Sequence, residues 1–244
     1  MTSSDIEIRT CTLLKEVRAC IELQQLVWQD PDLEVAPLHV FVAARETGGQ
    51  VFGAFDQDQL VGFTLSFAAL RQGRPYLHSH MTAVRPGLQN RKIGRRLKLF
   101  QREDALSRGI DRIEWTFDPM ELRNAHFNIN RLGAIVRRLH PNLYGITPSP
   151  LHSGLPTDRF VAEWWLKSPR VESILSGQAE DSLKQGERVL LPAAIDKIKS
   201  HDRQAALAIQ SEFRLEIRRR FNEGYAVTGF ELREETAAYI LERL

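Results

Sequence analysis

Two histidines, His78 and His80, lie two residues apart in the run 76–84, whose pattern predicts a β-strand. Side chains two apart in a strand point to the same face, so we expect the imidazoles to be neighbours. An imidazole titrates close to neutral pH, as a general base should, which makes this pair a candidate for accepting a proton. A pair of partly buried, hydrogen-bonded histidines is the alternative. We expect no metal, because two histidines without a third ligand make a weak site.

A basic turn follows this strand and leads into a helix near Gly94. Pro86-Gly87 ends the strand, and Ile93, Leu97 and Phe100 then recur at helical spacing. The first N–H groups of a helix have no partner inside it, and together with the helix dipole they form an anion site. The positive charge near the turn comes from Arg85, Arg91, Lys92, Arg95, Arg96 and Lys98. A pyrophosphate is the natural ligand, and a solvated basic helix face is the alternative.

The elements that must position these groups alternate between strand and helix. Strand patterns cover 6–10, 50–55, 60–67, 76–84, 110–117, 134–139 and 160–166, and helical patterns cover 14–28, 91–108 and 121–132. They predict an α/β (α+β) fold, with a mixed, mostly antiparallel sheet and helices on both faces. The composition changes near 167–169, which predicts domains 1–167 and 168–244. The second domain is predicted to be an α/β extension. It contains a helix from about 202 and strands near 189–191, 225–232 and 239–241.

The composition argues against several classes of protein. The 244 residues contain 33 Lys and Arg against 31 Asp and Glu, and this balance argues against a nucleic-acid-binding protein. No apolar run approaches the roughly 20 residues of a membrane helix, and the first residues carry no secretory signal. Cys11 and Cys20 are too few for a disulfide scaffold. We expect a cytoplasmic protein that acts on small molecules and binds neither nucleic acid nor membrane.

The strand end 84–86 and the stretch 89–94 resemble the acyl-coenzyme A signature of GCN5-related N-acetyltransferases (GNAT). That signature is Gln or Arg, two residues, Gly, one residue, and then Gly or Ala. Gln89 and Gly94 match it, and Lys92 stands where the first glycine is usual. The order of predicted elements agrees with the family over about residues 5–166. The long helix and the segment 224–230 also resemble a longer bacterial branch of predicted acetyltransferases with a C-terminal extension.

The resemblance implies that acetyl-CoA, or another acyl-CoA, is the co-substrate. In this family the end of the fourth strand holds the pantetheine arm like an added strand, and backbone amides of the following turn hold the pyrophosphate. The cofactor-binding residues implied are Thr82, Ala83, Val84, Gln89, Asn90, Arg91, Lys92, Ile93, Gly94 and Arg95, with Asn124 and Asn128 near the arm.

The acid and the base are less directly implied. Family members often use a tyrosine four residues before the glycine that ends the helix after the fifth strand. With Gly133 as that glycine, Ile129 stands in the tyrosine's place. Tyr144, in the next loop, is our replacement acid, and a structural tyrosine is the alternative. Glu114 is a further candidate base beside His78 and His80, or an ordinary polar strand residue.

The expected reaction is acyl transfer, with acetyl as the first choice, by direct attack of a small amine on the thioester. An amino acid is one candidate acceptor, because Arg71 and Arg74 could bind a carboxylate, and a solvated turn is the alternative for these two arginines. N-succinyl transfer to amino acids is one alternative, and a non-catalytic acyl-CoA-binding sensor or docking module is the other. We expect the extension to pack on the first domain or on the second subunit of a homodimer.

Overall fold

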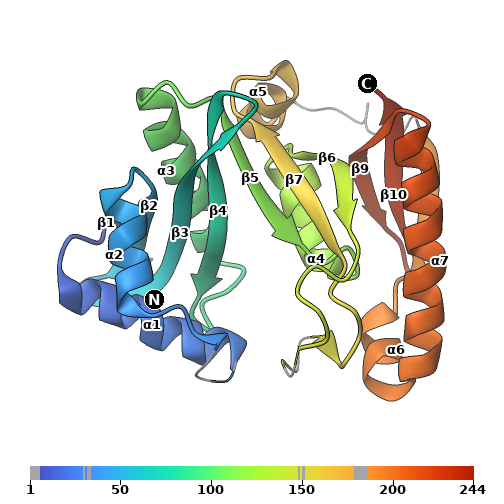
Figure 1. Cartoon of the computed structure of the whole chain (residues 1–244), viewed down its shortest axis with the longest axis horizontal. Coiled ribbons are helices and arrows are strands. Elements are labelled where there is room, and N and C mark those ends of the chain that lie inside the picture. The colour runs from blue at the N-terminus through green and yellow to red at the C-terminus, as the bar shows by residue number, and fades with distance from the viewer. Residues whose placement is uncertain (1–5, 30, 32–33, 148, 150–151, 179–185) are drawn as a thin grey trace. The chain divides into compact units, whose positions relative to one another are not determined.

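The computed structural model in Figure 1 describes residues 6–29, 31, 34–147, 149, 152–178 and 186–244. Its internal contacts divide the chain into two compact units, Met1–Glu114 and Trp115–Leu244. This division falls inside a strand and not near residue 167, so the domains 1–167 and 168–244 stay a prediction. Among the described residues, no helix combines the length and the apolar character that a membrane crossing needs.

The first unit builds its sheet from strands that follow one another in the chain. Its elements are β1 (Glu7–Thr10), α1 (Leu14–Trp28), α2 (Leu38–Glu46), β2 (Gln50–Asp56), β3 (Gln59–Arg71), β4 (Arg74–Val84), α3 (Ile93–Ser107) and the start of β5 (Arg112–Phe117). β1 to β4 pair in chain order, each antiparallel to the next, and β5 starts parallel to β4. The predicted strands and the helices 14–28 and 91–108 are confirmed, and α2 is an additional helix.

Helices cover both faces of this sheet. On one face, Val17 of α1 and Phe41 of α2 pack in one core with Phe63 of β3. On the other face, Ile93 and Leu97 of α3 pack in a second core. Neighbouring residues of β2, Val51 and Phe52, belong to different cores, as the alternation of side chains along a strand requires. The predicted mixed, mostly antiparallel sheet with helices on both faces is confirmed.

The second unit contains the rest of β5 and the remaining elements. They are α4 (Leu122–Ala125), η2 (His126–Arg131), β6 (Ile135–His140), β7 (Arg159–Trp165), α5 (Pro169–Ser176), β8 (Glu187–Pro192), α6 (Ile195–His201), α7 (Arg203–Asn222), β9 (Tyr225–Leu232) and β10 (Thr236–Arg243). The strand order is β5-β7-β6-β9-β10-β8. The single helix predicted over 121–132 is instead α4 followed by the π-helical turn η2. In that turn the amide of Leu132 reaches back five residues to the carbonyl of Phe127, at 3.1 Å.

Residues on both sides of position 168 share one core in this unit. The ring of Phe160 on β7 lies 5.9 Å from that of Phe213 on α7 and 5.3 Å from that of Tyr239 on β10. The guanidinium of Arg170 donates hydrogen bonds to the carbonyls of Gly133, at 3.2 Å, and of Thr228. The segment that follows residue 168 therefore covers side chains that precede it.

A chain truncated after Ser168 should aggregate, or melt far below the full chain. The truncation removes Phe213, Ile217 and Tyr239 from the core around Phe160, and each such burial stabilises by about 1.5–3 kcal/mol. It keeps the whole first unit. Size-exclusion chromatography and thermal unfolding test this expectation. A soluble, monomeric truncated chain with an unchanged melting temperature would show that the extension is an independent appendage.

Candidate functional site

Strand β4 carries the residues that are predicted to bind the pantetheine arm. On one edge, Thr82, Ala83 and Val84 pair with β3. Toward β5, β4 pairs at Leu77 and His78. A strand edge offers backbone N–H and C=O groups to an extended ligand. We therefore expect the arm on the edge of Thr82 to Val84 that faces away from β3.

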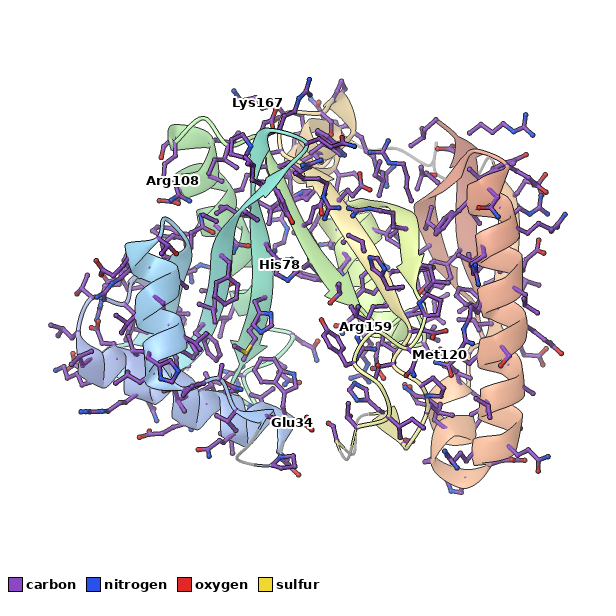
Figure 2. All side chains as sticks on the ribbon, in the orientation of Figure 1. Glu34, His78, Arg108, Met120, Arg159 and Lys167 are labelled. Atoms are coloured by element: carbon purple, nitrogen blue, oxygen red, sulfur yellow. The ribbon has the colours of Figure 1, made fainter. Side chains whose placement is uncertain are left out.

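The two histidines lie in the middle of β4. The β3–β4 register pairs Leu65 with Met81 and Ser66 with Ser79, so His80 is the extra residue of a β-bulge. The ring of His80 is 6.0 Å from that of His78 and 5.4 Å from that of Phe67. His78, labelled in Figure 2, is half-buried and His80 is exposed. The imidazoles are thus neighbours, as their spacing predicts.

Both imidazoles are biased toward the neutral form. Burial lowers the pKa of His78, and the neighbouring positive charges of His80, Lys98 and Arg71 lower it further against the opposing charge of Glu114. Desolvation by the surrounding protein lowers the pKa of His80. A neutral imidazole can accept a proton at pH 7, so both rings are in the state that a general base requires.

Glu114 lies beside His78 in the strand register and is only 1% exposed. Its Oε2 accepts a hydrogen bond from Nη2 of Arg71 at 3.1 Å, and its Oε1 lies 3.5 Å from Nε of Arg112. Guanidinium groups therefore contact both oxygens of the carboxylate. This arrangement favours charge balance as its role, and leaves the histidines as better-placed proton acceptors.

The turn between β4 and α3 keeps its shape without the usual first glycine. Asn90 and Lys92 adopt left-handed backbone conformations, with φ of 65° and 64°. Glycine adopts this conformation freely, whereas for most other residues it is sterically unfavourable. Lys92, the departure from the family signature, therefore takes the backbone conformation in which a glycine would be favoured.

Gly94 has room for a side chain. A Cβ atom added there would meet only Cγ2 of Val84, at the ordinary contact distance of 3.8 Å. The packing of the chain does not require a glycine, so a ligand that approaches the backbone is the better reason for one. Nearby, Nε of Arg95 is buried and has no hydrogen-bond partner among the described residues. Both features fit a bound pyrophosphate.

Two of the six basic residues expected around the turn point elsewhere. Lys98 is only 3% exposed, and its Nζ donates to Oγ of Ser79 at 3.0 Å and to Oε1 of Gln101 at 2.7 Å. Arg96 donates to the carbonyl of Ile6. The expectation that Lys98 adds charge at the turn is therefore wrong. Burial lowers the pKa of Lys98 to about 7.

Lys98 belongs to a buried polar chain that sequence reasoning missed. Nε2 of Gln101 donates to Oγ1 of Thr64 at 3.4 Å, and that hydroxyl lies 3.1 Å from the hydroxyl of Thr82. The chain thus connects α3 with the strand residues expected to bind the pantetheine arm. One signal for it was present: Gln101 falls four residues after Leu97, on the apolar stripe of the helix.

The remaining predicted site residues belong to the second unit. Tyr144 is exposed, its hydroxyl lies 3.1 Å from Oγ1 of Thr116, and the guanidinium of Arg159 lies 5.4 Å from its ring centre. In α4 and η2, Asn124 is exposed and Asn128 is buried. Ile129 is completely buried, so a core side chain stands where many relatives carry a tyrosine.

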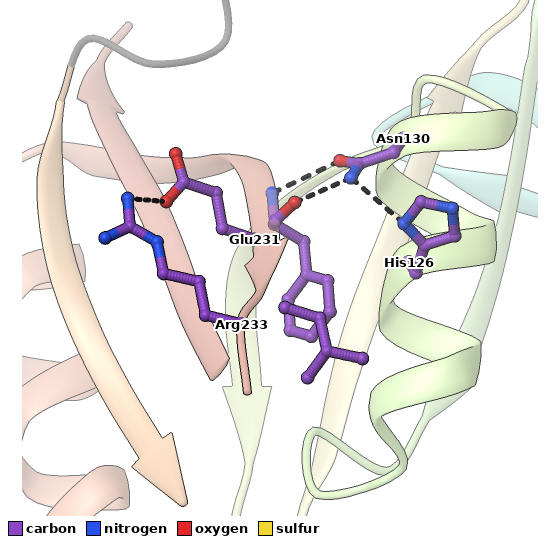
Figure 3. Close-up of a pocket in the computed structure, with 6 residues that line it drawn as sticks. His126, Asn130, Glu231 and Arg233 are labelled. Atoms are coloured by element: carbon purple, nitrogen blue, oxygen red, sulfur yellow. Dashed lines mark hydrogen bonds and ion pairs between the residues drawn. The ribbon is translucent and has the colours of Figure 1, made fainter. Parts of the chain in front are cut away.

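A pocket of about 490 Å³ lies in the second unit (Figure 3). It is lined by His126, Asn130, Phe230, Glu231, Leu232 and Arg233. The side chain of Asn130 donates to the carbonyl of Phe230 at 2.6 Å and accepts from its amide at 3.2 Å. These bonds fix β9 on η2, which indicates a structural role. No group of three or more His, Cys, Asp or Glu side chains that could hold a metal occurs among the described residues.

Comparisons with known proteins agree with this architecture. Residues 17–133 match the model of the acetyltransferase (GNAT) family. The chain is similar to the ribosomal-protein-S18-alanine N-acetyltransferase of Escherichia coli, with a TM-score of 0.54 and 13% identity over 74% of this chain and 99% of that one. It is also similar to yncA of Salmonella typhimurium, solved with its cofactor acetyl-CoA (TM-score 0.54, 15% identity, 68% and 97% covered). A GNAT-family protein of Desulfovibrio desulfuricans gives a TM-score of 0.54 at 13% identity, with 66% and 99% covered. No curated protein matches the sequence.

Proposed function

We propose that this protein transfers an acetyl group from acetyl-CoA to a small amine, as the match of residues 17–133 to the acetyltransferase (GNAT) family model supports. The observation that carries the proposal is the turn before Gly94, where an added Cβ atom would meet only Val84 and where Nε of Arg95 is buried without a hydrogen-bond partner among the described residues. Strand and turn together offer one continuous run of backbone groups for an extended, anionic ligand. An amino acid is our preferred acceptor class.

The residues of the first unit fit an acyl-CoA. Backbone groups of Thr82, Ala83 and Val84 would pair with the pantetheine arm. Amides from Gln89 to Arg95, including those of Asn90, Arg91, Lys92, Ile93 and Gly94, would surround the pyrophosphate, with the side chains of Arg91 and Arg95 adding charge. We assign Asn124 and Asn128 of the second unit to the arm as well.

Acetyl-CoA supplies the acetyl group as a thioester, and coenzyme A leaves as a thiol. His78 or His80 accepts the proton that the amine nitrogen loses as it bonds to the carbonyl carbon. The bond between that carbon and sulfur then breaks, and Tyr144 is our candidate donor of a proton to the sulfur. A free thiol titrates near 8.5, so a weak acid is enough for this step.

The test is thiol release from acetyl-CoA in the presence of amino acids and polyamines. Turnover with product identified by mass spectrometry supports the enzyme. The buried Ile129 favours one competing function, an acyl-CoA-binding sensor, because it removes the usual phenol. Tight acyl-CoA binding without turnover, over acetyl and succinyl donors and a broad set of amines, would favour that sensor.

Gly94→Glu should lower the affinity for coenzyme A by at least about 100-fold, because the carboxylate would both occupy the ligand's path and repel the pyrophosphate. Gly94→Ala is the matched control. Its methyl group meets only Val84, at 3.8 Å, so the variant should fold normally and lose less affinity. Isothermal titration calorimetry measures both. Unchanged coenzyme A affinity in a folded Gly94→Glu protein would place the ligand elsewhere.

A further inference from the structure

Arg71 lies in a compact charged cluster on the strands that carry the histidines. We use the name Arg71 cluster for Arg71, Tyr76, Arg112 and Glu114. Nη2 of Arg71 contacts the buried Glu114 carboxylate at 3.1 Å and the hydroxyl of Tyr76 at 3.4 Å. The guanidiniums of Arg71 and Arg112 lie 5.4 and 5.0 Å from the centre of the Tyr76 ring. The ring and the carboxylate together hold Arg71 in place.

Arg71 keeps hydrogen-bonding capacity for a ligand. Its side chain is 42% exposed, and both of its contacts use Nη2. Its Nε and Nη1 have no protein partner among the described residues. Glu114 also contacts Arg112, so this carboxylate is shared between two cations and balances Arg71 only in part. Each of these two nitrogens can donate a charge-assisted hydrogen bond to a carboxylate oxygen.

The cluster lies on the same face as the candidate base. Glu114 and His78 are paired in the parallel register of β4 and β5, and paired residues in neighbouring strands share a face of the sheet. The electrostatic effects of Arg71 and Glu114 on His78 agree with this proximity. A ligand that contacts Arg71 therefore approaches the side of the sheet on which the amine would lose its proton.

We propose that Arg71 binds the carboxylate of a substrate and so selects a substrate with a free acid group. The inference rests on the proposed function and narrows it. The carboxylate belongs either to the acceptor, which is then an amino acid, or to the acyl group of the donor, which is then a dicarboxylic acyl-CoA such as succinyl-CoA. Both sources present the same chemistry to the guanidinium.

Two substrate pairs distinguish these sources. The first compares an amino acid with its carboxamide, both with acetyl-CoA as the donor. The second compares succinyl-CoA with acetyl-CoA on the carboxamide. Arg71→Gln should raise KM for the carboxylate-bearing member of one pair by about 10- to 100-fold, the usual effect of losing a charged hydrogen bond. KM for the uncharged member should change less than about threefold, and Arg71→Lys should recover part of the loss.

Arg74→Gln is the comparison, because Arg74 is the other arginine that the sequence offers for the carboxylate, and it is exposed on the same hairpin outside the cluster. Equal effects of the two substitutions, or equal effects on the charged and uncharged members of both pairs, would overturn the assignment to Arg71. Thermal unfolding checks that the variants fold.

The carboxylate site at Arg71 can be tested even if the proposed acetyl transfer is wrong. If the wild-type protein turns over no pair, calorimetry with the amino acid and with succinyl-CoA still tests the carboxylate site. Binding that Arg71→Gln weakens about tenfold or more, and Arg74→Gln does not, supports the site without the reaction. Binding that is absent, or indifferent to Arg71→Gln, overturns it.

Discussion

Replacing both histidines, as His78→Gln with His80→Gln, is expected to lower kcat/KM for acyl transfer by about 100- to 10,000-fold, the usual contribution of a general base. The rings are 6.0 Å apart on the strand that carries the proposed arm-binding residues, so either could accept the proton when the other is absent. The single variants show which of them does so. Glutamine keeps hydrogen-bonding capacity but cannot accept a proton near neutral pH.

The lowered pKa values also predict how kcat/KM changes with pH. The pKa of each imidazole is lowered, so the wild-type base remains deprotonated at pH values somewhat below the ordinary imidazole range. The kcat/KM of the wild type should fall only as the pH drops through the lowered pKa. The double variant should not show this decrease of kcat/KM at low pH. Coenzyme A affinity is the control and should be unchanged. Values of kcat/KM that stay within a few-fold of wild type across pH would mean that the base lies elsewhere or that water suffices.

Lys98→Met is expected to abolish a large pH dependence of stability. The folded pKa of about 7 lies below the ordinary 10.5, so between these values the unfolded chain holds a proton that the folded protein has released. The free energy of unfolding of the wild type therefore rises with pH, by about 2 kcal/mol from pH 7 to pH 9. Below pH 7 the lysine is charged in both states, and the cost of burying its charge is fully present.

Urea unfolding of both proteins across this pH range makes the comparison. Methionine does not titrate, so Lys98→Met should lack the rise of about 2 kcal/mol that is attributed to Lys98, whatever it loses by leaving Ser79 and Gln101 without their donor. Lys92→Met is the matched control, since Lys92 is exposed, and it should keep the rise. Parallel curves for wild type and Lys98→Met would show that Lys98 keeps an ordinary pKa in the folded protein.

The sequence predicts most of the fold, because periodicity identifies strands and helices with one buried face. It does not indicate α2. The stretch Leu38–Glu46 is apolar along much of its length. The periodicity of such a run does not distinguish a helix from a strand, and packing against the rest of the protein determines which one forms. The sequence also does not predict the π-helical turn η2. Its hydrogen bonds span five residues where those of an α-helix span four, and no particular residue type marks this difference.

For the candidate site, the turn around Gly94 was visible as a motif, whereas its surroundings were not. A lysine is almost always exposed, so residue type alone placed Lys98 at the surface. The position of Glu114 between two arginines depends on the register of β4 and β5, which pair across a long connection, and no local pattern fixes that register.

The strand orders of the two units have a consequence for the order of events during synthesis. β1 to β4 pair with their sequence neighbours, so each strand can join the sheet as soon as it leaves the ribosome. β6, in contrast, has β9 as one of its neighbours and must wait until α7 and β9 have been made. The nascent chain should therefore fold its first unit, with the turn around Gly94, while the second unit is still incomplete.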